Sequence, residues 1–189
     1  RHSFQPADNE QNGPRLRVEA RDIEQTHLCL ALRGLSANHP DRFALDLLNV
    51  VLGEGMTSRL FLEVRERLGL AYDVNSSINH YSDAGSLTIY AGVEPSRLEL
   101  ALSTIIGELV RLCQGIPEEE IVKAKEFSKG RLLLRMEDTR SIAGWLGGQE
   151  LLMERILTVD EVIAKIDAVS PDDLKHIAQQ LITSDKLSL

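Results

Sequence analysis

The stretch GMTSRLFLEVRERLGLAY, residues 55–72, decides the fold because it encodes a helix that leads directly into a strand. Thr57 or Ser58 is expected to cap the start of the helix, since a hydroxyl side chain can satisfy the unpaired backbone N–H groups there. Gly69 is expected to end the helix, because glycine readily adopts the backbone conformation that terminates helices. A strand is then predicted from Ala71, so this stretch forms a helix-to-strand corner.

One arginine of this helix has no obvious local partner. Arg59, Glu63 and Arg67 are spaced four residues apart, which predicts a ladder of ion pairs on the exposed face. The neighbours of Arg65 at three and four positions are instead apolar or small: Phe61, Leu62, Leu68 and Gly69. Its guanidinium must reach water, pair with a distant acid, or face a cavity in which a ligand supplies negative charge. The first two outcomes are the more common in proteins.

Tyr72 follows Arg65 by seven residues and lies at the start of the predicted strand. Strand alternation would place it on the same face as His80, to which we assign no catalytic role. A structural tyrosine with its hydroxyl bonded to the backbone is one interpretation. The other is that Arg65 and Tyr72 converge at the corner, where they would offer one charged and one neutral donor to an oxyanion.

The rest of the chain predicts an α+β fold. Alternating apolar residues indicate strands at 26–34, 71–80 and 85–93, the last two joined as a hairpin. Apolar residues at helical spacing predict helices that begin near Pro40, Ser96, Glu118, Arg140, Thr158 and Ser170; the helix from Arg140 would run to Glu154. Ser96 and Glu99 have the spacing of a capping box. Because strands come early and helices late, we expect an antiparallel sheet with helices packed against it.

The length of 189 residues suits one domain of ordinary size. Residues 1–15 are polar and contain Pro and Gly, so we expect a linker or loose arm, with a single domain over 16–189. The chain opens at Arg1, and its last residues, 186–189, are typical of the start of a strand. We therefore expect a domain of a longer, soluble protein, whose compartment could be the cytoplasm, the periplasm or an organelle matrix.

Composition argues against several classes of function. The formal net charge is −8 and aromatic residues make up only 4%, which disfavours nucleic acid and anionic membranes as partners. No apolar run is long enough to cross a membrane. The two cysteines, Cys29 and Cys113, are too far apart in sequence to indicate a zinc knuckle.

The chain shows no local pattern for metal binding or nucleophilic catalysis. Its histidines are never three or four residues apart, and neither His-x-x-Glu-His nor His-Glu-x-x-His occurs. There is no Gly-x-Ser-x-Gly, and the glycines at 53 and 55 lack the Gly-Lys-Ser/Thr ending of a phosphate-binding loop. We therefore expect no metal ligands in this chain.

Residues 55–72 closely resemble the signature of the pitrilysin/insulinase family of zinc metallopeptidases, in its processing-peptidase branch. The resemblance extends to residues 22–25, to the hairpin at 81–92 and to the long helices, so it covers nearly all of the chain beyond residue 15. Glu54 departs from the pattern, since many relatives have glycine at this position.

This resemblance implies homologous α+β domains, of the LuxS/processing-peptidase-like fold, that close around a chamber. One domain holds zinc through an inverted His-x-x-Glu-His helix and a distal Glu. A later domain presents an Arg and a Tyr, matched here by Arg65 and Tyr72, and this chain resembles that later domain. The implied cofactor is zinc in an upstream domain or a partner subunit, with none in this chain. The implied reaction is attack of a zinc-activated water on a peptide or unfolded protein.

In this interpretation Arg65 and Tyr72 are catalytic and substrate-binding residues, and the chain by itself is inactive. The family also contains degenerate subunits, so a non-catalytic scaffold or assembly subunit is the alternative. The retention of Arg65 and Tyr72 favours the enzyme. A plain helical binding module is a third interpretation, which leaves the match over residues 55–72 unexplained. A domain face that is normally covered could also make the chain form homo-oligomers.

Overall fold

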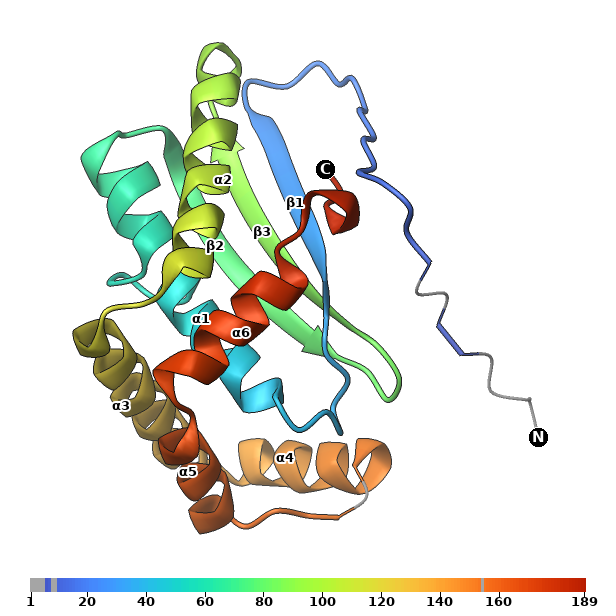
Figure 1. Ribbon diagram of the computed structural model, residues 1–189, viewed down its shortest axis with the longest axis vertical. Helices are drawn as coiled ribbons and strands as arrows, with labels where there is room; N and C mark the ends of the chain where they lie inside the picture. The colour runs from blue at the N-terminus through green and yellow to red at the C-terminus, as the bar shows by residue number, and fades with distance from the viewer. Residues whose placement is uncertain (1–5, 8–9, 154) are drawn as a thin grey trace.

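Figure 1 shows a computed structural model of the protein, which describes residues 6–7, 10–153 and 155–189. Its centre is a three-stranded antiparallel sheet of order β1-β3-β2. The strands are β1 (Thr26–Gly34), β2 (Ala71–His80) and β3 (Gly85–Val93), with the bounds that the alternation predicted. Helices cover one face of this sheet, so the predicted α+β class is confirmed.

The core lies between the sheet and helices α1 (Arg42–Gly53), α2 (Leu98–Gln114) and α6 (Pro171–Leu181). Alternate residues of β1 and β3 line it: Leu28, Leu30, Leu32, Leu87, Ile89, Ala91 and Val93. Each fully buried leucine or isoleucine contributes about 1.5–3 kcal/mol relative to an exposed one. The fold therefore rests on this apolar layer, and the opposite face of the sheet carries polar side chains.

The remaining helices lie at one end of the molecule: α3 (Glu118–Arg135), α4 (Thr139–Leu152) and α5 (Val159–Ala168). Thr158 and Ser170 form complete capping boxes at the starts of α5 and α6. The predicted helix from Arg140 begins one residue earlier, and the expected end at Glu154 lies outside the described residues.

The capping box predicted at Ser96 and Glu99 is wrong. Pro95 starts a short 3-10 turn, η2 (Pro95–Arg97), and Ser96 lies within this turn rather than at the N-cap of α2. The hydroxyl of Ser96 donates to the carboxylate of Glu94 at 2.7 Å. In the described part of the chain no side chain caps α2, whose N-cap position is Arg97.

The last residues of the chain pair with the outer edge of β1. After a 3-10 turn, η3 (Ser184–Lys186), Ser188 forms an antiparallel bridge with Ala31 and a parallel bridge with Arg15. The backbone N–H groups of Ser188 and Ala31 donate to each other's carbonyls at 2.9 and 2.7 Å. Strand-like pairing thus occurs at the predicted place, over a shorter length than 186–189.

The end of α1 packs tightly against β2, and this contact can be tested at a glycine. A Cβ at Gly53 would lie 2.5 Å from the Oγ and 2.6 Å from the backbone N of Ser76. We expect Gly53→Ala to lower the free energy of unfolding by about 2 kcal/mol, because overpacking forces backbone shifts. The control is Gly107→Ala within α2, where no atom lies within 4 Å of the added carbon. Urea unfolding should show that Gly107→Ala raises the free energy of unfolding by about 0.5–1 kcal/mol. An equal loss of this free energy in both variants would contradict the tight packing at Gly53.

A second contact between β2 and α1 should make stability depend on pH. The Nε2 of His80 lies 3.0 Å from the carboxylate of Asp46, and its Nδ1 lies 2.6 Å from the carbonyl oxygen of Leu35. Both partners are acceptors, so the ring is best satisfied as the doubly protonated cation. Burial and the charge of Arg42 lower the pKa of His80, but Asp46 and the Leu35 carbonyl outweigh them and raise it.

Because the pKa is raised by folding, the contribution of this pair is complete below the unfolded pKa, about 6.5. It is lost as the pH rises through the higher pKa of the folded state. We therefore expect Asp46→Asn to lower the free energy of unfolding more at a pH of about 5.5 than at about 8.5. Urea titrations at both pH values measure this difference, and an equal loss at both would show that His80 stays neutral.

Candidate functional site

The corner between residues 55 and 72 begins with a loop rather than a capped helix. Ser58 is only 2% exposed, and its hydroxyl donates to the carbonyl of Gly55 at 2.7 Å. This bond closes the loop on itself, so the prediction that Thr57 or Ser58 caps the helix is wrong. Within the described chain no side chain caps the segment that follows.

The segment itself is a π-helix, η1 (Phe61–Arg67), and not the predicted α-helix. Its widened turn is closed by the N–H of Leu68, which donates to the carbonyl of Glu63 five residues earlier at 3.1 Å. Gly69, with φ of 57°, ends the helix at the predicted position. π-helical segments are rare in proteins, and those that do occur are often found at functional sites.

The strand that follows contains a β-bulge at Tyr72. Ala71 pairs with Val93 and Asp73 pairs with Gly92, so Tyr72 is the extra residue on β2. The bulge turns its side chain outward: Ala71 is 6% exposed, whereas Tyr72 is 79% exposed.

The prediction that Tyr72 shares a strand face with His80 is therefore wrong. Strand alternation holds only where the ladder is uninterrupted, and one extra residue moves a side chain to the other face. The side chain of His80 is turned toward α1, on the covered face of the sheet, where it contacts Asp46.

The π-helix and the bulge bring Arg65 and Tyr72 together. The guanidinium carbon of Arg65 lies 5.7 Å from the centre of the Tyr72 ring and 5.0 Å from that of Phe61. The nearest carboxylate is that of Glu66, with 3.9 Å between Nε and Oε1. The expectation that Arg65 lacks any local carboxylate is thus corrected, although this contact is long and largely exposed. The guanidinium of Arg65 thus lies against two aromatic rings, and the side chain remains 41% exposed.

The arrangement suits the binding of an oxygen atom with negative charge. A guanidinium has five N–H donors, and a phenol adds one O–H donor. Among the described residues, neither Arg65 nor the hydroxyl of Tyr72 donates a hydrogen bond to another group of the protein. Contact with the rings orients the guanidinium without using its donors. The pair can therefore donate to an external carbonyl or carboxylate.

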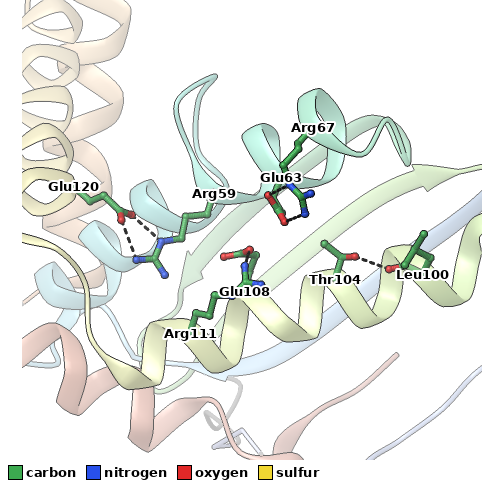
Figure 2. Close-up of polar contacts among 8 residues, drawn as sticks. All are labelled: Arg59, Glu63, Arg67, Leu100, Thr104, Glu108, Arg111 and Glu120. Atoms are coloured by element: carbon green, nitrogen blue, oxygen red, sulfur yellow. Dashed lines mark hydrogen bonds and ion pairs between the residues drawn. The ribbon is translucent and has the colours of Figure 1, made fainter.

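Behind this corner lies a cluster of three arginines and three glutamates between η1, α2 and α3, shown in Figure 2. The predicted pair of Glu63 and Arg67 is formed, but Arg59 does not join the ladder. Arg59 instead binds Glu120 of α3 through two hydrogen bonds of 2.7 and 3.1 Å. Arg59 lies two residues before η1, and its guanidinium is turned toward α3 rather than toward Glu63.

Sequence reasoning missed Glu108 and Glu120. Glu108 is 3% exposed, and the available signal was its position within the apolar stripe of α2, one residue before the buried Leu109. Burial raises the pKa of Glu108, while the charges of Arg111 and Arg59 oppose this effect. For Glu120 the sequence offers no comparable signal, because its partner is 61 residues away.

Glu108 supplies a pH-dependent test of this cluster. A carboxyl whose pKa is raised by folding makes stability fall as the pH rises above its unfolded pKa, about 4.3. We expect Glu108→Gln to have a higher free energy of unfolding than the unchanged protein near pH 7, and to lose that advantage near pH 4. Urea unfolding at both values measures this, and a variant that is less stable at pH 7 would contradict it.

Neither a metal site nor a single membrane-spanning helix is found in the part of the chain that the structure describes. No group of three or more His, Cys, Asp and Glu residues there could hold a metal ion. No one helix there is long and apolar enough to cross a membrane. One pair, η2–α2 followed by α3, reaches the necessary length and apolar composition when taken together, but is bent by 101° at its break.

Comparison with known proteins identifies the family. The profile of the peptidase M16 inactive domain matches residues 2–127. The chain therefore belongs to the peptidase M16 family, as a domain of the inactive type, and the resemblance to the pitrilysin/insulinase peptidases is confirmed.

Named relatives and solved structures agree with this assignment. An uncharacterized zinc protease of Bacillus subtilis, YmxG, is 42% identical over 166 residues, which cover 87% of this chain and 41% of the relative. The chain thus spans about two fifths of the length of such relatives. A protease from Helicobacter pylori shares the fold with a TM-score of 0.88 at 24% identity, covering 94% of this chain and 44% of that chain. A peptidase M16 inactive domain from Pseudomonas fluorescens does so with a TM-score of 0.81 at 24% identity, covering 93% and 42%.

Proposed function

We propose that this chain is the substrate-side domain of a zinc-dependent endopeptidase, and that Arg65 and Tyr72 bind the peptide at the bond to be cleaved. The observation that carries the proposal is the meeting of the two side chains at an exposed corner. Two structural irregularities, the π-helix and the bulge, are needed to produce this meeting. The family supports the same conclusion, since relatives from Bacillus subtilis and Streptomyces coelicolor are named zinc proteases.

The described residues of this chain do not fit a zinc ion, so in this proposal the metal belongs to an upstream domain or a partner subunit. When bound there, zinc supplies an activated water for peptide hydrolysis. This chain supplies hydrogen-bond donors: the guanidinium of Arg65 and the hydroxyl of Tyr72 hold a backbone carbonyl oxygen of the substrate. As negative charge develops on this oxygen, the fixed positive charge of Arg65 stabilises it.

The contacts of Arg65 with aromatic rings, rather than with a strong carboxylate partner, also fit this role. A guanidinium whose counter-charge arrives only with substrate needs a contact that orients it without neutralising it. The rings of Phe61 and Tyr72 provide that contact. A strong local carboxylate would instead compete with the substrate for the same donors.

We expect Arg65→Ala and Tyr72→Phe each to lower kcat/KM for peptide hydrolysis by about 100-fold in the full-length or assembled enzyme, the usual loss for one oxyanion donor. Both side chains are largely exposed, so the melting temperature should change little. The matched controls are Arg67→Ala on the same helix and Tyr81→Phe. Tyr81 is also an exposed tyrosine, 57% accessible, and directly follows the far end of β2. Both control variants should keep the activity of the unchanged enzyme.

Recombination separates this proposal from the scaffold alternative. Hydrolysis of a peptide, with zinc present, should appear only when this chain is joined to its natural upstream half. A stable complex without activity would favour a non-catalytic scaffold. If Arg65→Ala or Tyr72→Phe unfolds the domain while the remaining folded fraction is fully active, the two residues are structural and the proposal fails.

A further inference from the structure

We infer that the ion pair between Arg59 and Glu120 positions the Arg65–Tyr72 corner, so that helix α3 sets the alignment of the substrate-binding donors. This inference rests on the proposed function, because it gives Arg59 and Glu120 a role only through Arg65 and Tyr72. Neither residue is taken to touch the substrate.

The geometry of the pair is that of a rigid connection. The Nε and Nη2 of Arg59 donate to the two carboxylate oxygens of Glu120 at 2.7 and 3.1 Å (Figure 2). Such a bidentate pair fixes both the distance and the relative orientation of its partners. The side chain of Arg59 is 16% exposed and that of Glu120 is 35% exposed, so water screens the pair less than it would at the surface.

Apart from this pair, the π-helix is attached through its buried side and at its end, where Arg97 donates to the carbonyl of Gly69 at 3.1 Å. Leu60 and Val64 are fully buried and anchor one side of the segment. Most of the remaining side chains of η1 face outward, including Leu62, which is 50% exposed. Arg59 attaches the start of the segment to α3 through Glu120, six residues before Arg65.

The other ion pairs of the cluster cannot serve this purpose. Glu63 and Arg67 both belong to η1, and Glu108 and Arg111 both belong to α2. Of the ion pairs that the structure describes in this cluster, the one between Arg59 and Glu120 joins the residues just before η1 to a separate helix, α3. It also borders an open groove of about 750 Å³ lined by residues of η1, α2 and α3, so solvent reaches the segment on that side.

The test uses Glu120→Gln in the full-length or assembled enzyme. Glutamine keeps the size and one acceptor oxygen of the side chain but removes the charge and the second acceptor. We expect kcat/KM to fall about 10-fold, because small displacements of catalytic groups are costly. We also expect faster hydrogen exchange of the amides of Leu68 and Gly69, which close the π-helix. The melting temperature should change little, since an ion pair that is partly open to water adds little net stability.

Glu119→Gln is the matched control. Glu119 is the neighbouring residue in the first turn of α3, and it pairs with Lys123 on the same helix at the surface. Its substitution removes the same charge from the same helix end without loosening η1, so activity and exchange should stay as in the unchanged enzyme. If Glu120→Gln behaves like Glu119→Gln in both measurements, the inference is overturned.

A combined variant shows whether the effect passes through Arg65. On the background of Arg65→Ala, Glu120→Gln should lower kcat/KM by clearly less than 10-fold, because there is no longer a guanidinium to position. A full additional 10-fold loss would mean that Glu120 acts elsewhere, and would overturn the inference. If Arg65→Ala alone has normal activity, the proposed function fails. Faster exchange in Glu120→Gln than in Glu119→Gln would then still support the mechanical link from α3 to the corner.

Discussion

The single extra residue in β2 is the constraint on which the site depends. Because Ala71 and Asp73 pair with consecutive residues of β3, Tyr72 is pushed out of the ladder and its ring turns to solvent. With a regular ladder, its side chain would lie on the covered face of the sheet with Val74, and no phenol would stand beside Arg65. The bulge thus converts a position that strand periodicity assigns to the core into one that can meet a ligand.

A second irregularity completes the site from the other side of Gly69. The π-helix places Arg65 over the rings of Phe61 and Tyr72, and Arg59, two residues before this helix, forms an ion pair with Glu120 of α3. The corner enters the apolar core through Leu60, Val64, Leu70 and Ala71, whereas Arg65 and Tyr72 are exposed. We therefore expect stability and the proposed substrate binding to be carried by different residues, so that the exposed donors can be changed without unfolding the domain.

The sequence allowed the fold class and the three strands to be predicted with their bounds, because buried and exposed residues alternate along β1, along β3 and along β2 beyond its bulge. It also allowed the stop at Gly69 to be placed, whereas the pairing of Arg65 with Tyr72 was one of two interpretations until the resemblance to the peptidase family favoured it. The bulge and the π-helix could not be predicted, since periodicity assumes regular elements. The bond from Arg59 to Glu120 could not be predicted either, because its partners are 61 residues apart. The capping box at Ser96 failed for a similar reason: the turn begun by Pro95 displaced it from the N-cap.

A crystal structure of the full-length protein with a bound peptide would test the central claim most directly. The account predicts that a guanidinium N–H of Arg65 and the hydroxyl of Tyr72 both lie about 3 Å from one backbone carbonyl oxygen of the peptide. It also predicts that the bulge and the pair of Arg59 with Glu120 are unchanged in the complex. A peptide bound away from this corner, with Arg65 still stacked and without contact to it, would contradict the account.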